Sequence, residues 1–143
     1  MEVLLACAIL IDNDLMTNKE YNQYLDELFV KTPDNSLLIE LEWCSSNIKQ
    51  SIIIIKRYFV EQRINYNKFG MFLLSKLEKV YQSNKMNIKD FGERMYLLWK
   101  SLPPYIQDVE PFHILSYADE PLSWGDEKQT REIYEYMFNS YNG

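Results

Sequence analysis

The sequence predicts an all-α fold in which residues 1–143 form a single helical domain of about five to seven packed helices. Polar residues that cap helices precede several stretches whose apolar residues recur at the three- and four-residue spacing of a helix face. Only 4 Gly and 5 Pro interrupt the chain, and 47% of its residues are apolar. This composition excludes collagen and low-complexity disorder, and the length suits one domain.

The first apolar stretch, residues 3–11, reads VLLACAILI. Glu2 precedes it and Asp12 follows it, whereas a signal peptide carries positive charge before its apolar segment. The stretch is also far shorter than the roughly 20 residues that a membrane-spanning helix needs. We therefore predict that it belongs to the core, and that the protein is cytoplasmic and has no membrane partner.

The two cysteines, Cys7 and Cys44, lie within or beside apolar runs. Disulfides are rare in cytoplasmic proteins, and free cysteines are often buried. We expect two reduced, buried thiols.

The next element is a helix over residues 17–31. Thr17 and Glu20 form a capping box, in which a hydroxyl is followed three residues later by a carboxylate. Residues 32–35 (TPDN) end this helix. Its predicted inner face consists of Tyr21, Tyr24, Leu25, Leu28 and Phe29.

Residues 36–63 are ambiguous between helix and strand. Residues 39–43 alternate as a strand does, and residues 52–55 are a β-branched run, so minor strand content around residues 39–55 is the alternative. However, no Gly or Pro interrupts the segment. We favour two helices that are broken near residues 45–47, and the sequence leaves helix against strand open for residues 37–60.

Three further helices have clearer signals. Asn65, Asn87 and Asp126 each precede a stretch with helical spacing and are predicted N-caps. Pro103 and Pro104 end the second of these helices, and residues 105–125 are predicted to form one or two short helices. The predicted inner face of the last helix consists of Thr130, Ile133, Tyr134, Met137, Phe138 and Tyr141.

Charge is distributed unevenly along the chain. Residues 1–48 carry a net charge of −7, residues 49–100 carry +7 and residues 101–143 carry −6, so that the whole chain carries −6. The basic middle segment is one way in which the chain could bind nucleic acid. The net negative charge disfavours nucleic acid as a partner and favours a solvated face that pairs in part with the acidic termini.

No pattern of catalytic residues is present. His113 could form a triad on paper with Ser116 or Ser123 and an aspartate, but no Gly-x-Ser-x-Gly motif supports it. One His and two distant Cys give no metal-ligand spacing, and the 4 Gly form no phosphate-binding loop. We predict no enzyme activity, no catalytic residues, no metal and no cofactor.

The segment over residues 105–126 mixes aromatic side chains with carboxylates. Tyr and Trp are enriched at binding hot spots, and a rim of carboxylates attracts a basic partner. The alternative is that its aromatic residues belong to the core and its acids are merely solvated. The candidate partner-binding residues are Tyr117, Asp119, Glu120, Trp124 and Asp126.

The last part of the chain contains three short segments, WKSLP at residues 99–103, Pro111-Phe112 and YADEPLSWGD at residues 117–126. Together they resemble small acidic bacterial immunity proteins of toxin–immunity systems. The resemblance covers about 30 residues. It implies a cytoplasmic protein without catalysis that binds a cognate protein toxin and blocks it. Because these families differ in fold, the resemblance implies neither an architecture nor site residues.

We therefore expect an immunity or inhibitor protein that occludes a basic toxin which acts on nucleic acid. The alternative function is a nucleic-acid-binding or regulatory domain that uses residues 49–100. The sequence leaves open the oligomeric state, the identity of the partner and which acidic surface binds it.

Overall fold

The computed structural model describes residues 1–141. Eight α-helices and three short 3₁₀ helices form within these residues, and no strand does. The all-α class is confirmed, and residues 39–55 are helical apart from the turn that joins two helices. The chain forms two compact units, unit 1 (residues 1–69) and unit 2 (residue 70 onward), which are described separately. A single domain over residues 1–143 stays a prediction.

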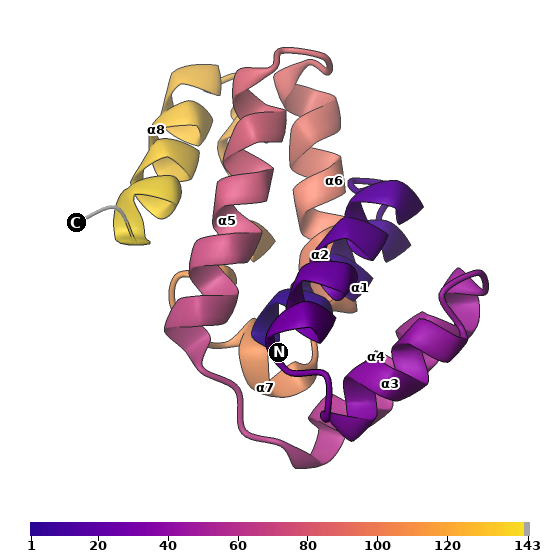
Figure 1. Cartoon of the computed structure of the whole chain (residues 1–143). Helices are drawn as coiled ribbons and strands as arrows, with labels where there is room; N and C mark the ends of the chain where they lie inside the picture. The colour runs from indigo at the N-terminus through magenta and orange to yellow at the C-terminus, as the bar shows by residue number, and fades with distance from the viewer. Residues whose placement is uncertain (142–143) are drawn as a thin grey trace. The chain divides into compact units, whose positions relative to one another are not determined.

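Unit 1 contains four helices: α1 (Glu2–Asp12), α2 (Asn18–Lys31), α3 (Ser36–Trp43) and α4 (Ile48–Glu61). Helix α1 contacts both α2 and α4, and α3 contacts α2 and α4 (Figure 1). Residues 4–10 of α1 are at most 1% exposed, so the predicted assignment of this stretch to the core is confirmed. A helix that is apolar on all sides is typical of a position surrounded by other elements.

Side chains cap the first turns of α2 and α4 in unit 1, and the sequence predicts the first of these caps. Thr17 Oγ1 accepts a hydrogen bond from the Glu20 amide at 3.2 Å, which confirms the N-cap of α2. Asn47 Oδ1 accepts from the Gln50 amide at 3.2 Å and begins α4 directly after the turn. The predicted break near residues 45–47 is confirmed. Such caps satisfy amides that have no partner within the first turn of a helix.

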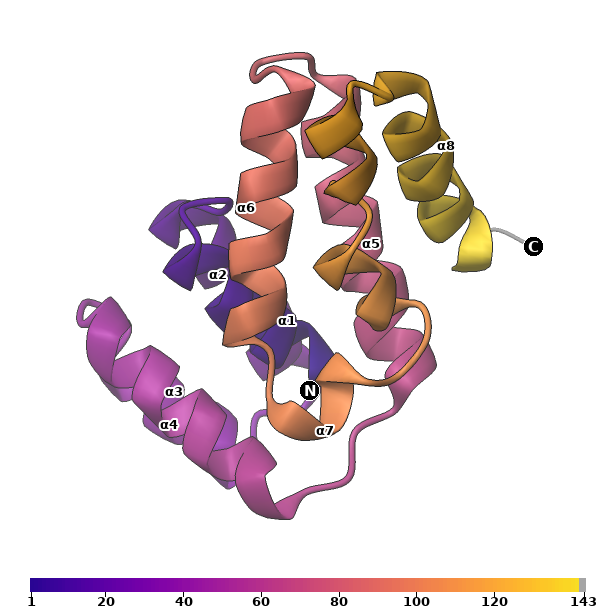
Figure 2. The same ribbon diagram turned by 180° about the vertical axis from the view of Figure 1, so that it is seen from behind.

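Unit 2 contains most of α5 (Tyr66–Gln82), followed by α6 (Ile88–Ser101), α7 (Pro104–Gln107) and α8 (Glu127–Phe138). Between α7 and α8 lie the 3₁₀ helices η1 (Phe112–Ser116) and η2 (Glu120–Trp124), and η3 (Asn139–Tyr141) follows α8. Figure 2 shows η1 and η2 running between α6 and α8. Helix α6 contacts η1, and α8 contacts η1 and η2.

A cluster of aromatic rings joins α5, α6 and α8. The Tyr81 ring centroid lies 5.3 Å from that of Phe91 and 5.5 Å from that of Phe138. Phe91 and Tyr134 meet edge to face, with centroids 5.0 Å apart. Ring pairs at these separations stabilise a core beyond the area that they bury. The cluster holds α8 in place and so positions the segment that precedes it.

The cysteines differ from each other. Neither cysteine forms a disulfide, and Cys7 is buried in α1 as predicted. The prediction that Cys44 is buried is wrong, because this residue is partly exposed. It is the C-cap of α3, where the chain turns toward α4 near the surface.

Candidate functional site

The candidate partner-binding residues lie on or beside η2, at the surface of unit 2. Trp124 is 63% exposed, and Glu120 is also exposed. Tyr117, Asp119 and Asp126 are half-buried. The alternative in which Trp124 belongs to the core is therefore wrong, whereas Phe112 and Leu115 are fully buried, as that alternative expected.

The backbone around η2 explains why Trp124 points outward. Pro121 is buried in the first turn of η2, and Gly125 ends η2 with a φ of 78°. This left-handed conformation is one that glycine adopts at little cost. The Asp126 amide then donates to the Pro121 carbonyl at 2.9 Å, which closes the turn. The exposed indole is thus mounted on a short, hydrogen-bonded segment.

Asp126 has a local role. Its Oδ1 accepts a hydrogen bond from the Gln129 amide at 3.0 Å and caps α8. An acceptor occupied in this way is less available to a partner. The structure therefore gives Asp126 the role of a helix cap, at the edge of the candidate surface.

Asp119 lies close against α6. A Cβ atom built on Gly92 would lie only 2.8 Å from the Asp119 Cβ, so the approach depends on glycine. Burial raises the pKa of Asp119, and the negative charges of Glu120 and Glu93 raise it further. These shifts show that several carboxylates share this part of the surface.

The surroundings of Tyr117 include two residues, Glu110 and Tyr136, that were not among the candidate partner-binding residues. Burial raises the pKa of Tyr117, and Glu110 and Tyr136 contribute to the same shift. Tyr136 lies on α8 and is 71% exposed. Sequence reasoning did not find Tyr136 because helical spacing places it on the outer face of α8, and an outer position predicts only a solvated side chain. We define the acidic aromatic surface as Glu110, Tyr117, Asp119, Glu120, Trp124 and Tyr136.

The basic residues after residue 100 pair with carboxylates outside this surface. Lys128 and Arg131 are the two basic residues after residue 100. Lys128 pairs with Glu132 at 3.9 Å, and Arg131 pairs with Glu127 at 3.1 Å. Within residues 1–141, no ion pair involves a carboxylate of the acidic aromatic surface. The surface therefore presents net negative charge beside exposed aromatic rings.

The triad drawn from the sequence does not form through its serines. The Ser116 hydroxyl donates to the backbone carbonyl of His113 at 2.6 Å, and the Ser123 hydroxyl donates to that of Glu120 at 2.8 Å. Asp126 accepts from the backbone of α8. A nucleophile needs a hydrogen bond to its base, and these three groups are each engaged with main chain.

Residues 1–141 contain no group of three or more His, Cys, Asp or Glu side chains arranged to hold a metal ion. None of the helices in the same range combines the length and the apolar character needed to cross a bilayer.

The basic middle segment is partly paired with acids from the N-terminal segment. In unit 1, Lys56 forms an ion pair with Asp12, and Arg57 lies 3.7 Å from Glu40. In unit 2, the Tyr96 and Trp99 rings stack with centroids 6.0 Å apart, and Lys100 lies over the Tyr96 ring. The structure thus contains both internal pairing and one basic aromatic group on α6.

No protein-family model, curated protein or solved structure significantly matches this chain.

Proposed function

We propose that this chain is an inhibitor of the immunity-protein type, which binds a basic protein toxin through the acidic aromatic surface and occludes it. The observation that carries the proposal is Trp124, which is 63% exposed at the end of η2, while the carboxylates of Asp119 and Glu120 at the start of η2 form no ion pair in the described residues. A large exposed aromatic residue on an ordered segment gains contact area on binding and loses little rotamer freedom.

The carboxylates supply the electrostatic part of the mechanism. A toxin that cleaves or modifies nucleic acid needs a basic cleft for phosphates. Glu120, Asp119 and Glu110 could occupy such a cleft in place of phosphates and steer the encounter, with association rates up to about 10⁸ M⁻¹s⁻¹ at low salt. Trp124 would then slow dissociation, because it is desolvated at the centre of the contact.

The proposal is tested by kinetic binding to candidate toxin domains encoded by neighbouring genes, over a salt series. We expect the Asp119→Asn/Glu120→Gln variant to associate more slowly and with a weaker salt dependence. Trp124→Ala should dissociate at least about 10-fold faster, which is the usual effect of losing a hot-spot residue.

The chain offers matched controls. Trp43, in unit 1, is 86% exposed, and Trp43→Ala should bind with wild-type kinetics. Glu27→Gln/Asp34→Asn removes two exposed charges from unit 1 and should leave the association rate nearly unchanged. Wild-type kinetics in both folded unit 2 variants would contradict the proposal, and slow association of the unit 1 variant would move the interface to α2.

A second function is favoured by one observation, the stacked Tyr96 and Trp99 rings with Lys100 over Tyr96. Aromatic stacking combined with positive charge is how many proteins hold single-stranded nucleic acid. The same salt series against single-stranded DNA and RNA separates the functions. Binding that weakens steeply with salt and is lost in Tyr96→Ala would favour a nucleic-acid-binding domain.

A further inference from the structure

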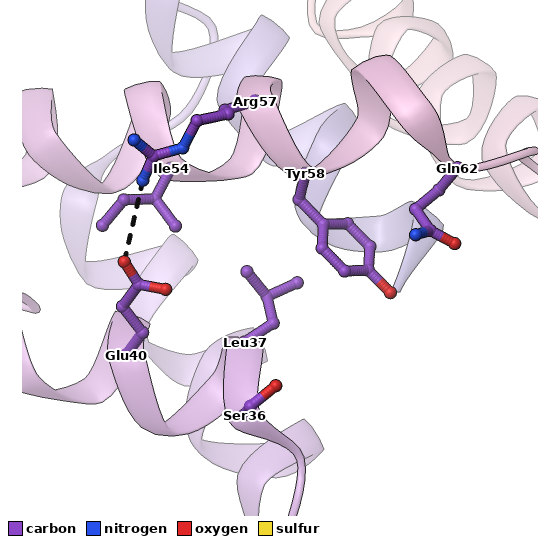
Figure 3. A pocket seen from close by; sticks show the side chains of 7 residues that line it. All are labelled: Ser36, Leu37, Glu40, Ile54, Arg57, Tyr58 and Gln62. Atoms are coloured by element: carbon purple, nitrogen blue, oxygen red, sulfur yellow. Dashed lines mark ion pairs between the residues drawn. The ribbon is translucent and has the colours of Figure 1, made fainter.

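Unit 1 contains a pocket between α3 and α4 that the sequence did not indicate (Figure 3). Its volume is about 280 Å³, close to the lower end of the range of about 300–1,000 Å³ that is typical of small-molecule sites. The apolar side chains that line it are Leu37 and Ile54, which are 5% and 4% exposed. The size suits a small metabolite and excludes a nucleotide cofactor.

One end of the pocket carries two opposite charges. Glu40 comes from α3 and Arg57 from α4, and the distance from Arg57 Nη2 to Glu40 Oε1 is 3.7 Å (Figure 3). A charge-assisted hydrogen bond is typically about 2.7–2.9 Å long, so the two groups face each other without closing such a bond. Their side chains are 68% and 53% exposed, and an exposed pair of this kind contributes little to stability. Both groups are therefore available to a ligand at little cost.

The other end of the pocket is polar and uncharged. Figure 3 shows Tyr58 and Gln62 together, away from the Glu40–Arg57 pair, with Ser36 below Leu37. Tyr58 lies on the last turn of α4, and Gln62 is the C-cap residue that follows the helix. Within the described residues, no hydrogen bond engages the Ser36 hydroxyl, the Tyr58 hydroxyl or the Gln62 amide. The pocket thus combines a charge pair, an apolar lining and uncommitted hydrogen-bonding groups.

We propose that this pocket binds a free α-amino acid. The ligand carboxylate binds Arg57, and its ammonium group binds Glu40. Its side chain lies over Leu37 and Ile54 toward Tyr58 and Gln62. The inference is independent of the proposed function, which uses a surface of unit 2.

The charges select this class of ligand. A simple anion would be attracted by Arg57 but repelled by Glu40. A simple cation would be attracted by Glu40 but repelled by Arg57. A zwitterion with its two charges on neighbouring carbons satisfies both groups, and it replaces one long ion pair with two charge-assisted hydrogen-bonding contacts. Each such contact is worth about 1.5–3 kcal/mol, which corresponds to roughly 10- to 100-fold in affinity.

The test uses the full chain and two probes, L-glutamine and L-leucine, which share the zwitterion and differ in the polarity of the side chain. Amide resonances followed by NMR during titration should show saturable shifts at α3 and α4 for at least one probe. N-acetylation of that probe, which removes the ammonium charge, should weaken binding at least about 10-fold, and amidation of its carboxylate should do the same.

Substitutions of the two charged pocket residues test whether the ligand binds in this pocket. Glu40→Gln and Arg57→Gln should each weaken binding at least about 10-fold while the far-ultraviolet circular dichroism stays native. Lys49→Gln is the matched control, because Lys49 is an exposed cation of α4 that does not line the pocket. The proposal is overturned if neither probe gives saturable shifts in the millimolar range. Equal binding of the acetylated probe, or unchanged affinity in folded Glu40→Gln and Arg57→Gln, would also overturn it.

Discussion

Asp119 is a carboxylate of unit 2 whose environment changes its own ionisation. Burial and the neighbouring carboxylates of Glu120 and Glu93 raise its pKa in the folded protein above the value of about 4 that is usual for an unfolded chain. Between these two values the folded state binds more protons than the unfolded state. The free energy of unfolding therefore falls as the pH rises through this window, and an ionised Asp119 lowers stability at neutral pH.

We predict that Asp119→Asn removes this loss. The free energy of unfolding that Asp119→Asn gains over the wild type should be larger at pH 7 than at pH 3. The difference between the two gains should be less than about 1 kcal/mol, because Asp119 is only half-buried. Chemical denaturation at a series of pH values measures the difference. Asp34→Asn, at an exposed position of unit 1, controls for the loss of one negative charge. A pH dependence identical to that of the wild type would show that the Asp119 environment is not as described.

Gly92 shows how one helix residue determines the approach of a neighbouring element. An added Cβ would lie 2.8 Å from the Asp119 Cβ, an atom that is fixed to the backbone and cannot rotate away. Overpacking costs about 1–3 kcal/mol, whereas alanine gains about 1 kcal/mol over glycine in a helix. The balance of these two effects is a destabilisation of about 0–2 kcal/mol, so we predict that Gly92→Ala lowers the free energy of unfolding by about 1 kcal/mol in chemical denaturation. Lys89→Ala, at an exposed position of α6, should change stability by less than about 0.5 kcal/mol.

The turn between α3 and α4 depends on Ser51, which is fully buried. Its hydroxyl lies 3.2 Å from both the Cys44 carbonyl and the Asn47 carbonyl. Ser51→Ala leaves a buried acceptor without this donor, so we predict a loss of about 1–3 kcal/mol in the free energy of unfolding. Ser75 is exposed and donates to a carbonyl of its own helix, and Ser75→Ala should have little effect. Equal effects of the two substitutions would contradict the role given to Ser51.

The elements that the sequence predicted are those with local signals. Thr17, Asn65, Asn87 and Asp126 each accept a hydrogen bond from the amide three residues beyond the cap, which sequence spacing can indicate. The apolar–polar alternation in residues 39–43 resembles a strand, in which Leu41 and Trp43 would share one buried face. In the helix α3, Leu38 and Leu41 are buried and Trp43 is exposed.

What the sequence could not predict depends on contacts between distant residues. The approach of Asp119 to Gly92 joins α6 to the chain before η2, and the Glu40–Arg57 pair joins α3 to α4. Tyr136 becomes part of the acidic aromatic surface only because α8 brings it near Tyr117. The spacing of residues within one element carries no information about such partners, which depend on how the elements pack.

At the scale of the whole molecule, the open question is whether units 1 and 2 unfold together. Cys7 is buried in unit 1, so its reaction with a thiol reagent reports the opening of that unit. In Cys44→Ser, we predict that Cys7 labelling and the far-ultraviolet circular dichroism change at the same denaturant concentration, as a single cooperative domain requires. Labelling of Cys7 at a clearly lower concentration than the loss of helix would show that unit 1 opens independently.

The exposure of the tryptophans has a spectroscopic consequence. Trp43 and Trp124 are 86% and 63% exposed, whereas the Trp99 indole is half-buried and donates its N–H to the Gln107 carbonyl at 3.0 Å. Two of the three indoles therefore emit from an aqueous environment in the native protein, so that unfolding shifts the emission maximum little. A partner that covers Trp124 would shift its emission to the blue and shield it from iodide quenching, while Trp43 would stay accessible. With Trp43 replaced by Phe, intrinsic fluorescence would report occupancy of the acidic aromatic surface without any added label.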